Sequence, residues 1–122
     1  MEPVRPTILI IDDDLPTLAL YERELSRDYR VLTCSDERRV LDVLGVENLS
    51  AVILEPVALG QQGWELLTTI RAQGATRSIP IILCSTQDER RRGLEMGATV
   101  CLTKPVLPTV LRRALHQVTQ PL

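Results

Sequence analysis

Five short apolar runs divide the chain, and each is followed by a segment whose apolar residues recur at helical spacing. The runs predict strands at residues 7–11, 30–34, 51–54, 81–84 and 99–102. Apolar runs of this length, without polar alternation, are typical of strands buried on both faces of a parallel sheet. The segments between them predict helices from 15 to about 27, from a cap at Ser35 to Gly45, from 64 to Gly74, from 87 to 96, and from Pro108 onward.

Alternation of strands and helices predicts an α/β fold, with helices on both faces of a doubly wound parallel sheet of five strands. Right-handed crossovers leave few topologies at this length, and the flavodoxin-like order 2-1-3-4-5 is the leading choice. The 122 residues suit a single domain, 1–122, with a core at about 7–118 behind a Pro-rich lead at 1–6. The inner faces of the second and last helices are expected to carry Val40, Leu41 and Leu44, and Val110, Leu111, Ala114, Leu115 and Val118.

Composition and charge narrow the classes of function. A net charge of −2 and an aromatic content of 2% argue against nucleic-acid binding. No apolar run approaches the length of a membrane span, and the N-terminus lacks the apolar region of a signal peptide. The three cysteines form no CxxC pair, so small buried thiols in a reducing compartment are expected. We therefore expect a cytoplasmic protein without a membrane partner.

Polar side chains follow four of the predicted strands. Because the carboxyl ends of parallel strands meet at one edge of the sheet, these side chains are expected to lie together. Crowded carboxylates tolerate one another only when some protonate or a cation joins them, and oxygen ligands suit magnesium. A lysine and hydroxyls beside them can hold a phosphoryl group. The residues concerned are Asp12, Asp13, Asp14, Glu55, Ser85, Thr86 and Lys104.

Several segments, in order, resemble the receiver domain of two-component response regulators over about Thr7 to Val118. They are Ile8–Asp14, Gly63–Leu67, Pro80–Ser85, Gly97–Ala98 and Thr103–Pro105. The resemblance places Glu55 at the phosphoacceptor position. It implies a weak magnesium site, with Asp13, Glu55 and the backbone carbonyl of Val57 as ligands and Asp12 bound through a water.

The resemblance also implies roles for the residues after the fourth and fifth strands. Lys104 would pair with the phosphoryl group, and Ser85, with Thr86 beside it, would bind phosphate and act as the switch hydroxyl. The Lys104–Pro105 peptide would be cis. The partners implied are a sensor histidine kinase or another signalling protein. A fused output domain, or a homodimer through the last two helices and the fifth strand, is a further alternative.

The sequence departs from the family at two important positions. The phosphoacceptor is an aspartate in the family, and Glu55 adds one C–C bond of about 1.5 Å. Three interpretations of Glu55 stay open: an inert acid paired with Lys104, a standing mimic of the phosphorylated state, and a slow acceptor. Cys101 replaces the aromatic switch residue, and is interpreted as core packing, with a redox switch as the alternative.

Two functional hypotheses from different classes remain. In the first, the chain is a phosphorelay receiver that is not an enzyme beyond catalysing its own phosphorylation and dephosphorylation, at a degenerate site. In the second, it is a pseudo-receiver that acts only by binding proteins. A flavin-binding domain is less favoured, because Asp12 to Asp14 would repel phosphate. Trp64 is expected under the loop at 57–63, Glu89–Arg92 on a solvated helix face or a partner contact, and His116 on the surface.

Overall fold

The computed structural model describes residues 4–120, so the predicted lead is described only from residue 4, and residues 121–122 lie outside the described part. Five parallel strands form one sheet in the order β2-β1-β3-β4-β5. Their bounds are Thr7–Ile11 (β1), Arg30–Cys34 (β2), Ala51–Leu54 (β3), Ile81–Ser85 (β4) and Val100–Thr103 (β5). The predicted α/β fold and its strand order are confirmed.

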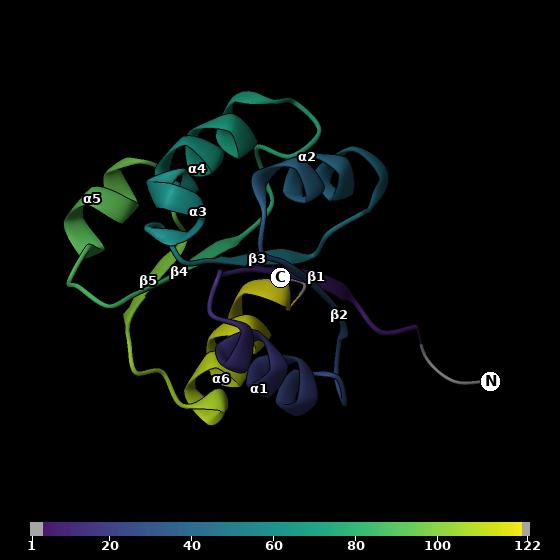
Figure 1. Ribbon diagram of the computed structural model, residues 1–122. Helices are drawn as coiled ribbons and strands as arrows, with labels where there is room; N and C mark the ends of the chain where they lie inside the picture. Colours follow the sequence, from purple (N-terminus) through teal and green to yellow (C-terminus); the bar gives the residue numbers. More distant parts are fainter. Residues whose placement is uncertain (1–3, 121–122) are drawn as a thin grey trace.

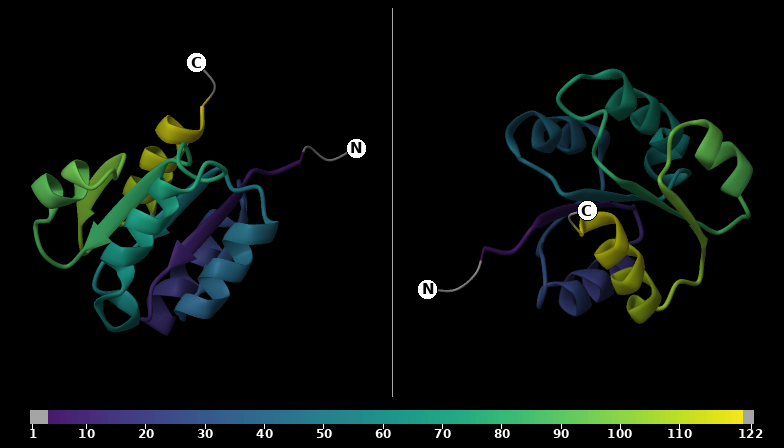
Figure 2. Two further views of the ribbon diagram at one scale, coloured as in Figure 1. Left: turned by 90° about the horizontal axis from the view of Figure 1, so that it is seen from above. Right: turned by 180° about the vertical axis from the view of Figure 1, so that it is seen from behind.

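Helices cover both faces of this sheet (Figure 1). On one face lie α2, α3, α4 and α5, and on the other lie α1 and α6, an arrangement that the view from behind repeats (Figure 2). Their bounds are Leu15–Leu25 (α1), Glu37–Val46 (α2), Ala58–Gln61 (α3), Gly63–Ala72 (α4), Arg90–Glu95 (α5) and Pro108–Thr119 (α6). No helix within residues 4–120 has both the length and the apolar character needed to cross a membrane.

Alternation along β1 divides the core into two layers. Ile8 and Ile10 pack with α1 and α6, whereas Leu9 and Ile11 pack with α2 and α4. Successive side chains of a strand point to opposite faces, so a strand covered on both sides must be apolar throughout. This explains why the strand runs are continuous rather than alternating.

The start and end of α2 differ from the prediction. Asp36 is the N-cap in place of Ser35, and its carboxylate accepts a hydrogen bond from the backbone N–H of Arg39 at 2.8 Å. The helix also continues through Gly45 to Val46. Two residues predicted on inner faces are exposed: Leu41 to 44% and Val110 to 42%. Each lies at the edge of the apolar stripe of its helix, where rotation of the helix by a fraction of a turn exposes the side chain to solvent.

The loop predicted at 57–63 contains the short turn α3, which the sequence did not indicate. Leu59 (φ 60°, ψ 39°) and Gly60 (φ 68°, ψ 34°) both have left-handed backbone conformations inside it. Leucine rarely adopts this conformation, because its Cβ crowds the following carbonyl oxygen. The segment directly after β3 is therefore a tight, strained reversal, and it leads within two residues into α4.

Candidate functional site

The carboxyl edge of the sheet brings together the charged residues predicted there. Asp12 is 4% exposed and Asp13 is exposed, because successive residues at the end of β1 point in opposite directions. Glu55, one residue past β3, is also 4% exposed. Its backbone N–H donates to the carbonyl of Ile11 at 3.0 Å, which holds the ends of β1 and β3 side by side.

Lys104 lies between the two buried carboxylates. Its Nζ donates a hydrogen bond to Asp12 Oδ2 at 2.7 Å and lies 3.1 Å from Glu55 Oε2. The three side chains are 16%, 6% and 5% exposed, for lysine, aspartate and glutamate respectively. At such burial an ammonium needs counter-charges and the carboxylates need a cation. One positive and two negative charges make a mutually dependent group, called here the Lys104 triad.

The two carboxylate oxygens of Glu55 have different surroundings. Oε1 accepts a hydrogen bond from the backbone N–H of Val57 at 3.2 Å. Oε2 is buried and accepts no aligned hydrogen bond within the described residues, although the charge of Lys104 is close to it. Glu55 is thus turned toward Lys104, with one oxygen held by the loop and the other stabilised by charge alone.

The pKa of Lys104 reflects this balance. Burial on its own would lower the pKa of the ammonium, but its contacts with Asp12 and Glu55 outweigh burial, and the pKa is raised. The lysine is therefore charged throughout the physiological range. A protonated Lys104 has no free lone pair with which to act as a general base.

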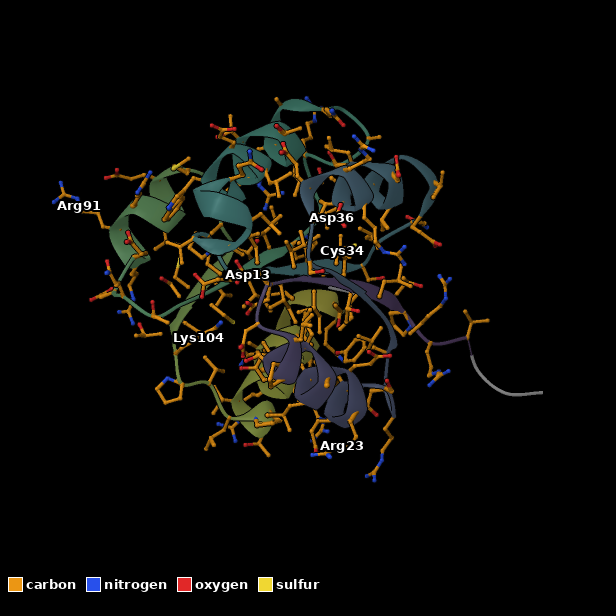
Figure 3. All side chains as sticks on the ribbon, viewed as in Figure 1. Asp13, Arg23, Cys34, Asp36, Arg91 and Lys104 are labelled. Atoms are coloured by element: carbon orange, nitrogen blue, oxygen red, sulfur yellow. The ribbon has the colours of Figure 1, made fainter. Side chains whose placement is uncertain are left out.

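Asp13 faces the loop after β3 rather than the triad. Its Oδ2 accepts a hydrogen bond from the backbone N–H of the strained residue Leu59 at 3.2 Å. Figure 3 shows Asp13 below α3 and Lys104 at the end of β5. Asp13 thus links the end of β1 to the reversal that follows Glu55.

The donor set fits magnesium only in a largely hydrated form. Among the residues described, no group of three or more acidic, histidine or cysteine side chains is arranged to hold a metal ion. Lys104 already neutralises charge between Asp12 and Glu55. Asp13 is exposed and can offer an oxygen, and Mg²⁺ commonly binds through one or two carboxylates while keeping several waters. The predicted set of Asp13, Glu55, the Val57 carbonyl and Asp12 through water would thus give a weak site.

Ser85 and Thr86 lie at the end of β4 in different environments. Ser85 is 2% exposed, and its Oγ accepts a hydrogen bond from the backbone N–H of Gln87 at 3.2 Å. Thr86 is exposed and lines a cavity of about 360 Å³ beside the triad. That cavity is lined by Thr17, Leu20, Tyr21, Thr86, Lys104, Pro105 and Val106. The Lys104–Pro105 peptide is cis.

Cys101, a residue of β5, packs against α5. A Cβ added to Gly93 of α5 would lie 2.6 Å from its Sγ, so helix and strand touch here. Burial raises the pKa of the Cys101 thiol, which disfavours the reactive thiolate that a redox switch requires. Burial also raises the pKa of Cys84 to about 12. Packing is the role that these surroundings favour for both thiols.

One contact near the site was not predicted from the sequence. The guanidinium carbon of Arg92 lies 4.0 Å from the centroid of the Trp64 ring, which joins α5 to α4. Both residues were singled out, yet only the fold reveals that they meet, since 27 positions separate them in the chain. The sequence pointed to this contact only through Trp64 at the start of one predicted helix and three arginines in the next.

Comparisons with known proteins bear on the family and the fold. The profile of the response regulator receiver domain matches residues 8–116. The rice (Oryza sativa subsp. indica) two-component response regulator ORR3 is 31% identical over 118 residues, which is 93% of this chain and 90% of the relative.

Among the solved structures that are similar to this chain are two with different origins. The chemotaxis protein CheY4 of Vibrio cholerae superimposes with a TM-score of 0.86 at 24% identity, covering 94% of this chain and 99% of that one. At this identity the likeness shows the fold alone. The receiver domain of the Pseudomonas aeruginosa sensor histidine kinase PA1611, which has a magnesium ion coordinated in its active-site cleft, superimposes with a TM-score of 0.80 at 26% identity. It covers 95% of this chain and 98% of that one.

Proposed function

The chain belongs to the response regulator receiver domains of two-component signalling, and we propose that it is a receiver whose phosphorylation site is degenerate. In this proposal it acts as a pseudo-receiver through contacts with other signalling proteins in the cytoplasm. A sensor histidine kinase is one such partner. Contacts through α5, β5 and α6 would serve a second copy or a fused output domain.

A single observation carries the proposal: the carboxylate at the acceptor position is already paired with the lysine that would otherwise pair with the phosphoryl group. Glu55 Oε2 lies 3.1 Å from Lys104 Nζ, and the side chain is 5% exposed. A phosphodonor must approach an acceptor oxygen in line, and a displacement of about 1 Å can cost on the order of 100-fold in rate. The extra C–C bond of Glu55, about 1.5 Å, exceeds that tolerance.

The charge of Glu55 gives the pairing a functional consequence. A phosphoryl group would bring about two negative charges to Lys104, whereas the Glu55 carboxylate brings one, at a distance of 3.1 Å. In the resting domain Lys104 therefore already has an anionic partner, as it would in the phosphorylated state, but this partner carries less negative charge. Weak, standing activity is the form of phosphomimicry that this contact supports.

A slow acceptor is the second candidate, and one observation favours it. Glu55 Oε2 accepts no aligned hydrogen bond within the described residues and is held near Lys104 by charge, so a lone pair stays available for attack. Attack by such an oxygen on the phosphorus of a small donor would form an acyl phosphate and release the donor's leaving group. Any weakly bound Mg²⁺ at Asp13 would offset charge on the incoming phosphoryl group.

Labelling by acetyl phosphate with Mg²⁺ distinguishes the two candidates. Intact-protein mass spectrometry should find little phosphoryl adduct on the wild-type chain. Glu55→Asp should gain labelling by on the order of 100-fold, because the carboxylate returns to the shorter reach. Glu55→Gln is the matched control, which keeps the length of the side chain and removes the nucleophile.

Strong labelling of the wild-type chain that hydroxylamine removes, and that Glu55→Gln abolishes, would overturn the degenerate-site proposal in favour of the slow acceptor. Absence of labelling in Glu55→Asp as well would show that the defect lies elsewhere in the site. Titration with Mg²⁺, followed by the fluorescence of Trp64, tests the metal separately: millimolar affinity that Asp13→Asn weakens is expected.

A further inference from the structure

Helix α5 depends on its neighbours for its position. It spans only Arg90–Glu95, six residues, and Gly93 is the one that is buried. Isolated helices of this length are unstable in water, so its contacts must fix both its formation and its place. At its N-terminus the N-cap residue Glu89 makes no side-chain hydrogen bond, and the carboxylate of Asp88 accepts one from the backbone N–H of Arg90 at 3.2 Å.

Close packing at Gly93 fixes how near α5 lies to the sheet. A Cβ at this position would lie 2.6 Å from Cys101 Sγ and 2.6 Å from Leu83 Cδ1. The helix backbone thus rests directly on β4 and β5. A glycine contact limits distance but has no side chain to resist sliding or rotation, so a second contact has to set the direction of the helix.

The stack of Arg92 on Trp64 is that second contact. The guanidinium carbon lies 4.0 Å from the ring centroid, well inside the range of a cation–π interaction. Trp64 is 8% exposed and belongs to the first turn of α4, so its ring is a fixed platform. Arg92 therefore connects the six-residue helix α5 to the longer helix α4.

The platform itself rests on the chain that follows Glu55. A Cβ on Gly63 would lie 2.4 Å from the carbonyl oxygen of Pro56, so the first residue of α4 touches the backbone next to Glu55. A shift of Pro56 therefore moves Gly63 and Trp64 with it. No atom of Cys101 or Ser85 takes part in this sequence of contacts.

We propose that Arg92 is the positioning residue of α5, and that the contacts from Pro56 through Gly63 and Trp64 to Arg92 couple position 55 to this helix. The route runs on the face of the sheet that α4 and α5 cover, and it needs no aromatic ring at position 101. It goes beyond the proposed function, because it holds whether or not Glu55 takes up phosphate. In this proposal the position of α5, and of the surface that it offers to partners, depends on the conformation of Pro56.

The first test measures amide hydrogen exchange of peptides from α5. Arg92→Ala should accelerate exchange there by about two- to fivefold, the factor that corresponds to a cation–π contact at an exposed site, with peptides of β1 unchanged. Arg92→Lys should restore most of the protection, since it keeps the cation. Arg91→Ala is the matched control, because Arg91 points away from the body of the molecule (Figure 3) and pairs with Glu95 on its own helix.

A double-variant cycle isolates the stack. Trp64→Leu should accelerate exchange in α5 as Arg92→Ala does, and the two changes together should add little, because both remove one interaction. Equal effects of Arg91→Ala and Arg92→Ala, or full additivity of Trp64→Leu with Arg92→Ala, would overturn the positioning role.

The second test addresses the coupling to position 55. Glu55→Gln should change the emission of Trp64, the only tryptophan in the chain, and alter exchange in α5 by about twofold or more. On the Arg92→Ala background the effect on α5 should disappear, while on the Arg91→Ala background it should persist. A Glu55→Gln effect on α5 that survives Arg92→Ala, or no effect in the otherwise wild-type chain, would overturn the route. This test does not measure phosphoryl labelling, so a result against the coupling route would not count against the degenerate-site proposal.

Discussion

Two cations hold opposite edges of the same sheet, and they are stabilised in different ways. At the carboxyl edge, Lys104 lies between the carboxylates of Asp12 and Glu55. At the amino edge, Arg71 of α4 donates to backbone carbonyls instead: its Nε to Gly97 at 2.7 Å and one terminal nitrogen to Ile79 at 2.6 Å. Among the ion pairs of the described residues, none involves Arg71.

The difference shows in the pKa of each cation. Burial lowers the pKa of Arg71, and no carboxylate compensates. Burial also acts on Lys104, but its two carboxylates raise the pKa overall. Carbonyl groups cannot gain or lose charge, so the contacts of Arg71 are fixed. The contacts of Lys104 change whenever the charge at position 55 changes. The contacts of Arg71 at the amino edge are therefore purely structural, whereas those of Lys104 at the carboxyl edge depend on the charge at position 55.

Removal of Lys104 should have the largest effect. Lys104→Met leaves two buried carboxylates without a cation, and loss of one partner of a buried ion pair typically costs about 3 kcal/mol or more of the free energy of unfolding. Urea denaturation at neutral pH measures it. The double variant Lys104→Met with Glu55→Gln should recover a large part of the loss, since only one buried carboxylate then remains unpaired.

Simple additivity of Lys104→Met and Glu55→Gln would contradict this account. It would mean that the triad is not a mutually dependent group, and the contrast between the two edges would fail.

Removal of Arg71 should cost less, about 2 kcal/mol, because its partners are neutral carbonyls that water can in part satisfy. Arg71→Met, measured in the same way, should be additive with Glu55→Gln to within about 0.5 kcal/mol. Arg77→Met, at an exposed position of the neighbouring loop, is the matched control. A strong interaction between Arg71→Met and Glu55→Gln would show that the amino edge also senses position 55.

Alkaline pH should produce the smallest effect. Because the folded pKa of Lys104 is raised above its ordinary value of 10.5, the lysine's contribution to stability is fully present below about pH 10.5. It is lost as the pH rises through the folded pKa. The difference in unfolding free energy between wild type and Lys104→Met should stay constant from pH 7 to 9.5 and shrink above 10.5.

The corresponding difference for Arg71→Met should stay level across the same range, because an arginine remains protonated there. A growing contribution of Lys104 above pH 10.5 would mean that its folded pKa is lowered, and that burial rather than the carboxylates dominates.

Much of this architecture was predictable because strands and helices carry local signals. The continuous apolar runs predicted all five strands, and chain-order rules predicted their arrangement, which the structure confirms. Helix ends were less accurate. Ser35 and Asp36 are both good N-caps, and the sequence alone does not decide between adjacent candidates. Leu59 gave no signal, because leucine rarely adopts a left-handed conformation; its backbone N–H donates to Asp13, 46 positions away.

The site was predictable as a set of residues but not as a geometry. Asp12 and Asp13 are equivalent in the sequence, and the strand's alternation makes one a buried partner of Lys104 and the other an exposed partner of the loop. The contact of Glu55 with Lys104 at 3.1 Å is a geometry that the inert acid and the standing mimic share. The stack of Arg92 on Trp64 depends on the relative placement of two helices, which no short-range pattern encodes.

The contact of Gly93 with Cys101 limits how this sequence can diverge. Even an alanine at position 93 would bring its Cβ within 2.6 Å of the sulfur. A ring at position 101 would need space that the backbone of α5 now occupies. Positions 93 and 101 therefore constrain each other: a larger residue at either one requires α5 to move away from the sheet. An aromatic residue at 101 would require α5 to move outward, and that movement would separate Arg92 from Trp64.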